Sequence, residues 1–261
     1  MAITEFHELT EAGPGRPRNE DAIGHWTCSD GLVFALANGF VVDGTAEPEA
    51  AQVASTLALE VFGRELGTFP AAWPLRARLQ RAVQAANVAL YQKAIAVPEL
   101  RAMRTTLTAT ALSADALVTV HVGDGRLFLL RDRVLTQLTK DHTWAQEPLR
   151  PGGPGRNGAH GPVHRYAVPR SLGHELVLST DVLTMTVRGG DTFLQSTIGL
   201  HTPLTDDELR EALEAHPPEA ACRALVRRVR LADGRDDASV QIVARAPSDE
   251  PADRGWRWFG R

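Results

Sequence analysis

The chain has 261 residues, 43% hydrophobic and 23% charged, which suits one large globular domain or two small ones with an ordinary balance of core and surface. Its formal net charge of −4 gives none of the basic character that nucleic-acid-binding proteins usually show. Only Cys28 and Cys222 occur, and no apolar stretch approaches the roughly 18 residues that span a bilayer, so we expect a cytoplasmic protein with no disulfide framework and with neither nucleic acid nor membrane as a partner.

The first half of the chain is predicted to hold two strands followed by two long helices. Residues 22–26 and 32–37 are apolar or β-branched and are bounded by Gly, Asp or Asn, which is typical of strands. Residues 48–66 and 74–94 carry apolar side chains at helical spacing with good helix formers between them. Both helices are long enough to cross a small domain.

The second half is predicted to continue with strands, a loop and two more helices. Helices are expected at 205–215, which opens with the capping sequence Thr-Asp-Asp-Glu, and at 218–231. Residues 146–161 are dense in Pro and Gly, so we expect a mobile surface loop there. We assign residues 1–246 to one domain of sheets covered by helices, and residues 247–261 to a flexible tail. The further strands are expected at 106–112, 117–122, 126–131, 134–138, 175–179 and 238–244.

Acidic or amide residues stand at the ends of several predicted strands. Asp21 precedes the strand at 22–26, and Asn38 follows the strand at 32–37. Asp181 follows the strand at 175–179, and Asp236 precedes the last strand. Each of these alone is commonly a plain surface turn. Carboxylates that converge from distant strand ends repel one another unless cations lie between them, and hard divalent ions prefer oxygen ligands, so the set favours a metal site.

Six motifs follow one another along nearly the whole chain. They are RPRNED at 16–21, LVFALANG at 32–39, MRTTLTATAL at 103–112, VTVHVGDGRLFLLRDRVLTQLTKDHTW at 118–144, STDVL at 179–183 and RDDASVQIV at 235–243. In this order they resemble the motifs of the metal-dependent protein phosphatases, the PPM or type-2C family, from about Glu11 to Ala244. The length of the fourth motif argues against accidental similarity.

The resemblance implies an α/β (α+β) fold, a four-layer α-β-β-α sandwich of two mostly antiparallel sheets flanked by helices. It also implies two Mg²⁺ or Mn²⁺ ions, or fewer in this chain, which activate a water molecule for direct hydrolysis of a phosphoserine or phosphothreonine ester. Arg16 would bind the substrate phosphate, since a guanidinium matches two phosphate oxygens. Asp21 and Asp181 would be catalytic as metal carboxylates. The implied metal ligands are Glu20, Asp21, Asn38, the carbonyl of Gly39, Asp124, Asp181 and Asp236.

Asn38 stands where the family places the aspartate that bridges both metal ions. Its amide offers only a neutral oxygen, and one charge pair at ~4 Å is worth about 4 kcal/mol at an effective dielectric of 20, so metal affinity should fall by orders of magnitude. In another register, Asp43-Gly44 would take this place. We favour Asn38, because LVFALANG is the longer strand and ends at the right point, with Asp43 as a nearby carboxylate that could partly substitute.

Other departures point the same way. Phe40 stands where some members have a histidine, Arg104 and Val182 replace glycines of the M-G-T-T and S-D-G motifs, and Asp237 replaces an asparagine. A β-branched valine tolerates poorly the backbone conformations that glycine permits, so the geometry of the site is also expected to differ.

Two hypotheses from different classes follow. The first is a Mg²⁺- or Mn²⁺-dependent serine/threonine protein phosphatase of weakened activity that opposes a kinase. The second is a catalytically inactive pseudophosphatase that binds a phosphoprotein or another partner. Retention of Asp21, Asp181 and Asp236 favours the enzyme, whereas Asn38 and the lost glycines favour the binding module. The sequence leans toward the enzyme.

Overall fold

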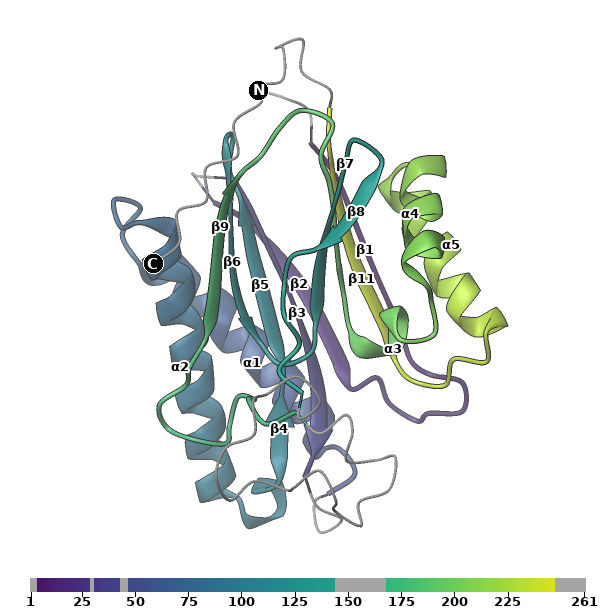
Figure 1. Cartoon of the computed structure of the whole chain (residues 1–261). Helices are drawn as coiled ribbons and strands as arrows, with labels where there is room; N and C mark the ends of the chain where they lie inside the picture. The colour runs from purple at the N-terminus through teal and green to yellow at the C-terminus, as the bar shows by residue number, and fades with distance from the viewer. Residues whose placement is uncertain (1–3, 29–30, 43–46, 144–167, 247–261) are drawn as a thin grey trace, which may run out of the picture.

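The computed structural model describes residues 4–28, 31–42, 47–143 and 168–246. These residues form two antiparallel sheets that pack face to face (Figure 1). One sheet has five strands in the order β1-β11-β10-β7-β8. In chain order its strands are β1 (Thr4–Glu11), β7 (Arg126–Arg131), β8 (Val134–Gln137), β10 (Thr192–Ser196) and β11 (Ala238–Arg245).

The other sheet has six strands in the order β2-β3-β5-β6-β9, with β4 paired to the end of β3. Strand β3 is the longest and pairs with β2, β4 and β5. In chain order the strands are β2 (Asp21–Cys28), β3 (Gly31–Val41), β4 (Met103–Thr105), β5 (Leu107–Leu112), β6 (Ala116–Val122) and β9 (Asp181–Thr186).

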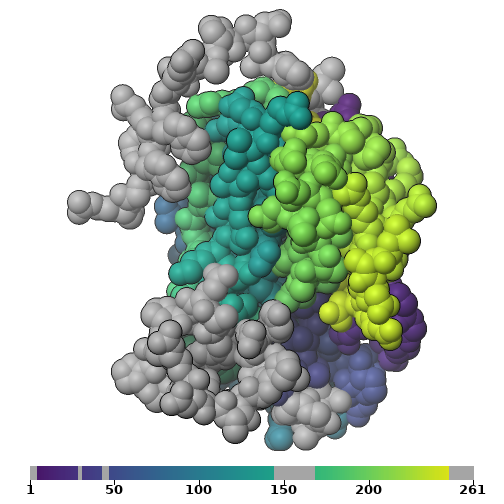
Figure 2. Space-filling view, turned by 45° about the vertical axis from the view of Figure 1, so that its right-hand side comes forward, coloured from purple at the N-terminus to yellow at the C-terminus, as the bar shows by residue number. Residues whose placement is uncertain are grey.

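Helices cover both outer faces of the sandwich. Figure 1 shows α1 and α2 against the six-stranded sheet and α4 and α5 against the five-stranded sheet. Figure 2 shows the second helical layer, coloured green to yellow, lying beside the teal strands β7 and β8. The helices are α1 (Ala50–Thr68), α2 (Leu75–Ala96), the 3-10 turn η1 (Pro98–Leu100), α3 (Ile198–His201), α4 (Asp206–Ala215) and α5 (Pro218–Leu231). The predicted four-layer α-β-β-α sandwich is therefore confirmed.

The alternation of side chains along β3 explains the layering. Val33, Ala35 and Ala37 pack with the residues of α1 and α2, whereas Phe34 points between the two sheets. There it packs with Phe193 and other apolar side chains of the five-stranded sheet. A strand that is buried on both faces reads as a continuous apolar run, which is why LVFALA was recognisable as a strand.

Buried glutamines tie the two sheets together. Thr110 on β5 donates a hydrogen bond to Gln195 Oε1 on β10 (2.7 Å), and Gln195 Nε2 donates to Gln241 Oε1 on β11 (3.1 Å). Gln241 Nε2 in turn donates to the carbonyl of Gly24 on β2 (3.1 Å). These bonds satisfy polar groups inside the sandwich and hold β2, β5, β10 and β11 in fixed relative positions.

The structure corrects the prediction of a strand at 175–179. Leu176 and Val177 of that apolar run are 51% and 79% exposed, and the strand begins later, at Asp181, as the outer strand β9. Hydrophobicity alone misplaced it, since the run has no buried face. Strands β1 and β10 were not predicted, because TEFHELTE is rich in charge and TFLQS is short.

Several predicted features lie outside the described residues: the loop at 146–161, the tail at 247–261 and the alternative metal residue Asp43. In the part of the chain that is described, no helix has both the length and the apolar character needed to cross a bilayer.

Candidate functional site

The ends of three strands, β2, β10 and β11, meet β3 at one end of the sandwich. Asp21 opens β2 and pairs in register with Asn38 on β3. On the other sheet, the backbone N–H of Thr197, just after β10, donates to the carbonyl of Ser239 on β11 (3.1 Å). The hydroxyls of Thr197 and Ser239 both reach Asp21, so this carboxylate connects the two sheets.

The carboxylate of Asp21 is buried and accepts hydrogen bonds through both oxygens. Its Oδ1 accepts from Asn38 Nδ2 at 2.6 Å, and its Oδ2 accepts from Thr197 Oγ1 and Ser239 Oγ, both at 2.7 Å. Burial raises the pKa of Asp21 to about 6, although these three bonds favour the ionised form. Both oxygens of Asp21, which was predicted as a metal ligand, thus accept hydrogen bonds from protein groups.

Asn38 is held rigidly in this arrangement. Its carbonyl accepts from the backbone N–H of Thr106 (3.0 Å) and from Thr105 Oγ1 (2.9 Å), and its own N–H donates to Thr106 Oγ1 (3.0 Å). The amide must direct N–H rather than oxygen toward Asp21, because two acceptors in contact would repel. Asn38 therefore acts as a hydrogen-bond donor to its neighbouring carboxylate.

The close approach of helix α1 to strand β3 explains why a glycine, Gly39, follows Asn38. A Cβ atom there would lie 1.9 Å from the carbonyl oxygen of Ala51, so helix α1 approaches the strand as closely as only glycine permits. The N–H of Gly39 donates to the carbonyl of Glu20 (2.9 Å). This contact brings Glu20 beside Asp21 and Asn38, as the sequence predicted.

Arg16 lies among carboxylates on the edge of this cluster. Its Nη2 pairs with Glu20 Oε2, and its Nη1 lies 3.4 Å from both Asp236 Oδ1 and Asp237 Oδ2. Burial raises the pKa of Glu20, and the neighbouring Asp237 and Asp236 add to the effect while Arg16 opposes it. The predicted phosphate-binding arginine is thus paired within the protein.

Asp124 is buried near the same cluster. Its Oδ1 accepts no hydrogen bond from any described residue. Burial, with the nearby carboxylates of Asp141 and Asp21, raises the pKa of Asp124 to about 7.

Asp181 does not join the cluster. It pairs in register with His121 on the outer strand β9, where its side chain is 48% exposed and contacts His142 Nε2 (3.2 Å) and Arg170 Nη1 (3.1 Å). Partial burial would raise the pKa of Asp181, but the hydrogen bond and charge of His142 and the charge of Arg170 lower it. Among described residues no hydrogen bond or ion pair connects it to Asp21, Asn38 or Asp236.

Residues 196–200, rather than the predicted residues 179–183, lie beside Asp21 where the S-D-G-L motif was expected. Ser196-Thr197-Ile198-Gly199-Leu200 follows the buried strand β10, and Thr197 binds Asp21. A Cβ at Gly199 would lie 2.9 Å from Asp236 Cβ and 2.1 Å from the carbonyl of Asp237, which puts this turn against the start of β11. Ile198, half-buried, occupies the aspartate position of the motif.

The sequence prediction assigned the S-D-G-L motif to STDVL, which contains an aspartate, and did not consider STIGL. The retained Gly199-Leu200 pair was the signal that pointed to the correct segment, since STDVL has valine where the motif has glycine. The prediction of Asp181 as a catalytic metal carboxylate therefore has no support in the arrangement of the cluster.

These residues do not fit a pair of divalent ions. Such an ion takes about six or more oxygen ligands. Here both oxygens of Asp21 already accept hydrogen bonds, Asn38 presents N–H, and Ile198 offers no donor atom. The Oδ1 atom of Asp124 accepts no hydrogen bond from a described residue and could bind a cation, but a single protein oxygen is too few to hold a pair of divalent ions. Across the described ranges, no group of three or more His, Cys, Asp or Glu side chains is arranged to hold a metal ion.

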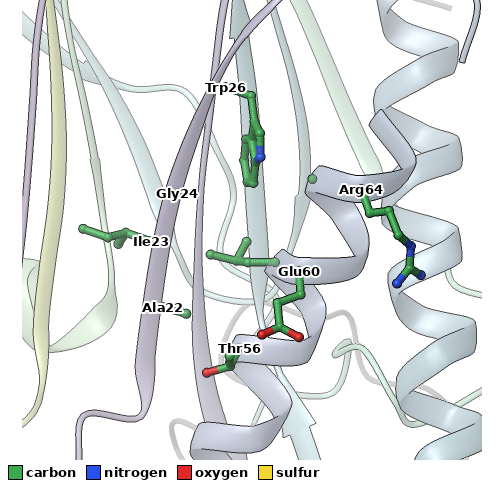
Figure 3. Close-up of a pocket in the computed structure, with 9 residues that line it drawn as sticks. Ala22, Ile23, Gly24, Trp26, Thr56, Glu60 and Arg64 are labelled. Carbon is green, nitrogen blue, oxygen red and sulfur yellow. The ribbon is translucent and has the colours of Figure 1, made fainter. Parts of the chain in front are cut away.

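A separate groove runs between strand β2 and helix α1 (Figure 3). Its volume is about 300 Å³, and Trp26 closes one side while Glu60 and Arg64 stand on the helix. Ala22 places the groove one residue from Asp21, but the groove contains none of the predicted site residues. It is a surface feature of the edge strand rather than part of the cluster.

The chain is similar in sequence to known protein phosphatases. Residues 15–216 match the family model described as protein phosphatase 2C. The chain is 33% identical over 243 residues to serine/threonine protein phosphatase PstP of Mycobacterium tuberculosis, covering 92% of this chain and 45% of that protein, so it spans less than half of this relative's length. It is 27% identical over 240 residues to serine/threonine phosphatase stp of Listeria monocytogenes, covering 90% of this chain and 94% of that protein.

Solved structures are similar over the same range. The crystal structure of the catalytic domain of PstP in complex with two manganese ions is 29% identical, with a TM-score of 0.76, and the match covers 94% of this chain and 100% of that one. The similarity thus extends through both sheets and both helical layers.

Proposed function

Because the chain belongs to the protein phosphatase 2C family, we propose that it recognises phosphoserine- or phosphothreonine-containing proteins and has lost the metal-dependent hydrolysis of the phosphate ester. The family assignment and the names of the relatives support the class of partner, a Ser/Thr-phosphorylated protein. Such a partner implies a protein kinase that supplies the phosphate. A cytoplasmic location stays a prediction.

One observation carries the loss of hydrolysis. Asn38 and Ile198 stand at two positions where the family motifs have aspartates, so the cluster lacks two carboxylates at once. An amide presents a neutral group and an isoleucine presents only carbon, and neither compensates a divalent charge. Without bound metal ions, no water molecule at the site has its pKa lowered toward neutrality. The related PstP catalytic domain, by contrast, is in complex with two manganese ions.

A second candidate function is slow metal-dependent hydrolysis. Glu20, Asp21, the Gly39 backbone and Asp236 still lie together, although Arg16 and Asn38 occupy their oxygens. A high concentration of Mn²⁺ that displaced these contacts could assemble one weak site. Only a measurement of turnover separates this candidate from complete loss.

Hydrolysis of p-nitrophenyl phosphate and of a phosphothreonine peptide, with and without Mn²⁺, tests the proposal. We expect no Mn²⁺-dependent turnover in the unmodified protein or in the single variants Asn38→Asp and Ile198→Asp. The double variant should acquire Mn²⁺-dependent turnover, because it restores both carboxylates. Both positions are half-buried, so the new charges can be solvated.

The matched control is the double variant with Asp236→Ala, in which the acquired turnover should disappear. Mn²⁺-dependent turnover in the unmodified protein that EDTA abolishes would contradict complete loss and establish the slow phosphatase instead.

Binding is measured separately with a pool of phosphothreonine peptides and the same pool without phosphate. We expect the phosphorylated pool to bind about tenfold more tightly, which corresponds to about 1.4 kcal/mol. Equal affinity for both pools would reject recognition of the phosphate and leave only a partner-binding domain.

A further inference from the structure

The loop between β1 and β2, residues 12–20, is fastened to the start of β11 by one buried carboxylate. Asp237 accepts hydrogen bonds from the backbone N–H groups of Gly13 (2.8 Å) and Glu20 (2.7 Å). A Cβ at Gly13 would lie 1.9 Å from the carbonyl oxygen of Arg235, so the two backbones are in close contact. Both ends of the loop therefore depend on the charge of Asp237.

Two further carboxylates stand beside Asp237. Glu20 and Asp236 contact the same guanidinium that contacts Asp237, that of Arg16. Three negative charges around a single guanidinium lie close enough to repel one another unless a cation lies between them. Asp237 is buried and Glu20 is half-buried, so water screens the repulsion only in part. The cation that all three share in the structure is Arg16.

Arg16 is well placed for this role. It belongs to the loop itself, where its N–H donates to the carbonyl of Gly13 (3.0 Å), and its side chain is 31% exposed. A guanidinium offers five N–H donors in a fixed plane and remains charged at every physiological pH, so it can serve several carboxylates at once. A divalent ion held by Glu20 and Asp236 would have to displace it.

We propose that Arg16 is the permanent counter-cation of Glu20, Asp236 and Asp237, and that this chain is stable without divalent metal because an internal guanidinium supplies the positive charge. The inference goes beyond the loss of hydrolysis, since it states what replaces the metal. It also gives Arg16 a different task from the phosphate binding that the family resemblance implied.

Thermal unfolding of the whole chain in EDTA and in 1 mM Mn²⁺ tests the proposal. The unmodified protein should unfold at the same temperature in both. Arg16→Gln should unfold about 5 °C or more below it in EDTA, because three carboxylates lose their cation, and Mn²⁺ should recover part of that difference. The matched control is Arg18→Gln, whose arginine is 42% exposed and lies 3.9 Å from its partner Glu49, and it should show neither effect.

Two further variants keep the test decisive if Arg16→Gln folds poorly. Arg16→Lys retains the positive charge, so its unfolding temperature should be the same in EDTA and in Mn²⁺. Arg16→Gln combined with Asp236→Asn removes one exposed carboxylate and should recover part of the lost unfolding temperature in EDTA. An unmodified protein stabilised by Mn²⁺, or an Arg16→Gln protein as stable as the control, would overturn the proposal.

These outcomes are independent of the test of function. Mn²⁺-dependent turnover in the unmodified protein would reject the proposed function, whereas the unfolding series reports on Arg16 without any substrate. Conversely, an Arg16→Gln protein as stable as the control would reject the role of Arg16 as counter-cation. It would not change the result on turnover, which is measured separately.

Discussion

The carboxylate of Asp124 shows how strongly a single buried charge depends on its surroundings. It is 4% exposed, has the carboxylates of Asp141 and Asp21 as neighbours, and has one oxygen that no described residue serves with a hydrogen bond. Its pKa is raised from 3.8 to about 7, so the folded state holds this proton more tightly than the unfolded state does. The charged form therefore costs stability.

The sign of the pH dependence follows from this difference. Well below pH 3.8 the carboxyl is protonated in both states and contributes nothing; between pH 3.8 and about 7 only the unfolded state ionises freely, so stability falls as the pH rises. We expect Asp124→Asn to raise the free energy of unfolding at pH 8, by up to about 4 kcal/mol, and to change it by less than about 1 kcal/mol at pH 4. Urea denaturation at both values measures this.

The matched control for Asp124→Asn is Asp115→Asn, an exposed position. It should change the free energy of unfolding by less than about 0.5 kcal/mol at either pH. An Asp124→Asn protein that is less stable at pH 8 would show that the carboxylate has a partner it needs.

At the scale of single elements, helix α4 has an N-terminus that its own sequence specifies. Thr205 and Glu208 form a capping box, in which Thr205 Oγ1 accepts from the N–H of Glu208 (3.3 Å) and Glu208 Oε2 accepts from the N–H of Thr205 (2.8 Å). The Thr-Asp-Asp-Glu sequence predicted this start, and the prediction is confirmed. The cap satisfies two backbone donors that a helix end otherwise leaves unpaired.

Thr205→Ala should lower the free energy of unfolding by about 1 kcal/mol, because the N3 donor loses its acceptor. Thr202→Ala is the control, since that threonine is exposed and its hydroxyl has no hydrogen bond to a described residue. Equal stability of the two variants in urea denaturation would mean that the cap contributes nothing measurable.

At the scale of the whole molecule, a buried ion pair fixes the connection between β9 of one sheet and β10 of the other. Arg131 on β7 donates from Nε and Nη2 to Asp191, at 2.7 and 2.6 Å, and Nη2 also donates to the carbonyl of Thr186 at the end of β9 (3.2 Å). The side chain of Asp191 is 1% exposed and that of Arg131 is 12% exposed. Removal of one partner would leave a charge buried without compensation.

We expect Asp191→Ala to lower the free energy of unfolding by about 3 to 5 kcal/mol. Glu211→Ala, which removes an exposed ion pair with Arg228, should cost less than about 1 kcal/mol. Chemical denaturation of both variants measures the contrast, and a small effect of Asp191→Ala would show that the Arg131–Asp191 pair contributes little to the connection between β9 and β10.

The sequence by itself determined the architecture and the family. Apolar runs and helical spacing located the central strands of the six-stranded sheet, the strands β7 and β11 that flank the unpredicted β10, and all four long helices, and α5 coincides with the predicted range 218–231. These features are local, because each depends on the period of apolar residues and on caps or turns within the same segment. Asn38 was predicted to follow the strand at 32–37, but β3 continues through Asn38 to Val41, where it pairs with β4.

Only the tertiary structure decided which residues form the cluster. STDVL and STIGL are similar in sequence, but β10 lies between β7 and β11, which brings Thr197 onto Asp21, while β9 is an outer strand of the other sheet and takes Asp181 to His142 and Arg170. Arg16 likewise meets Asp236, a residue 220 positions away. Such neighbours depend on strand order across two sheets, and no local pattern specifies strand order.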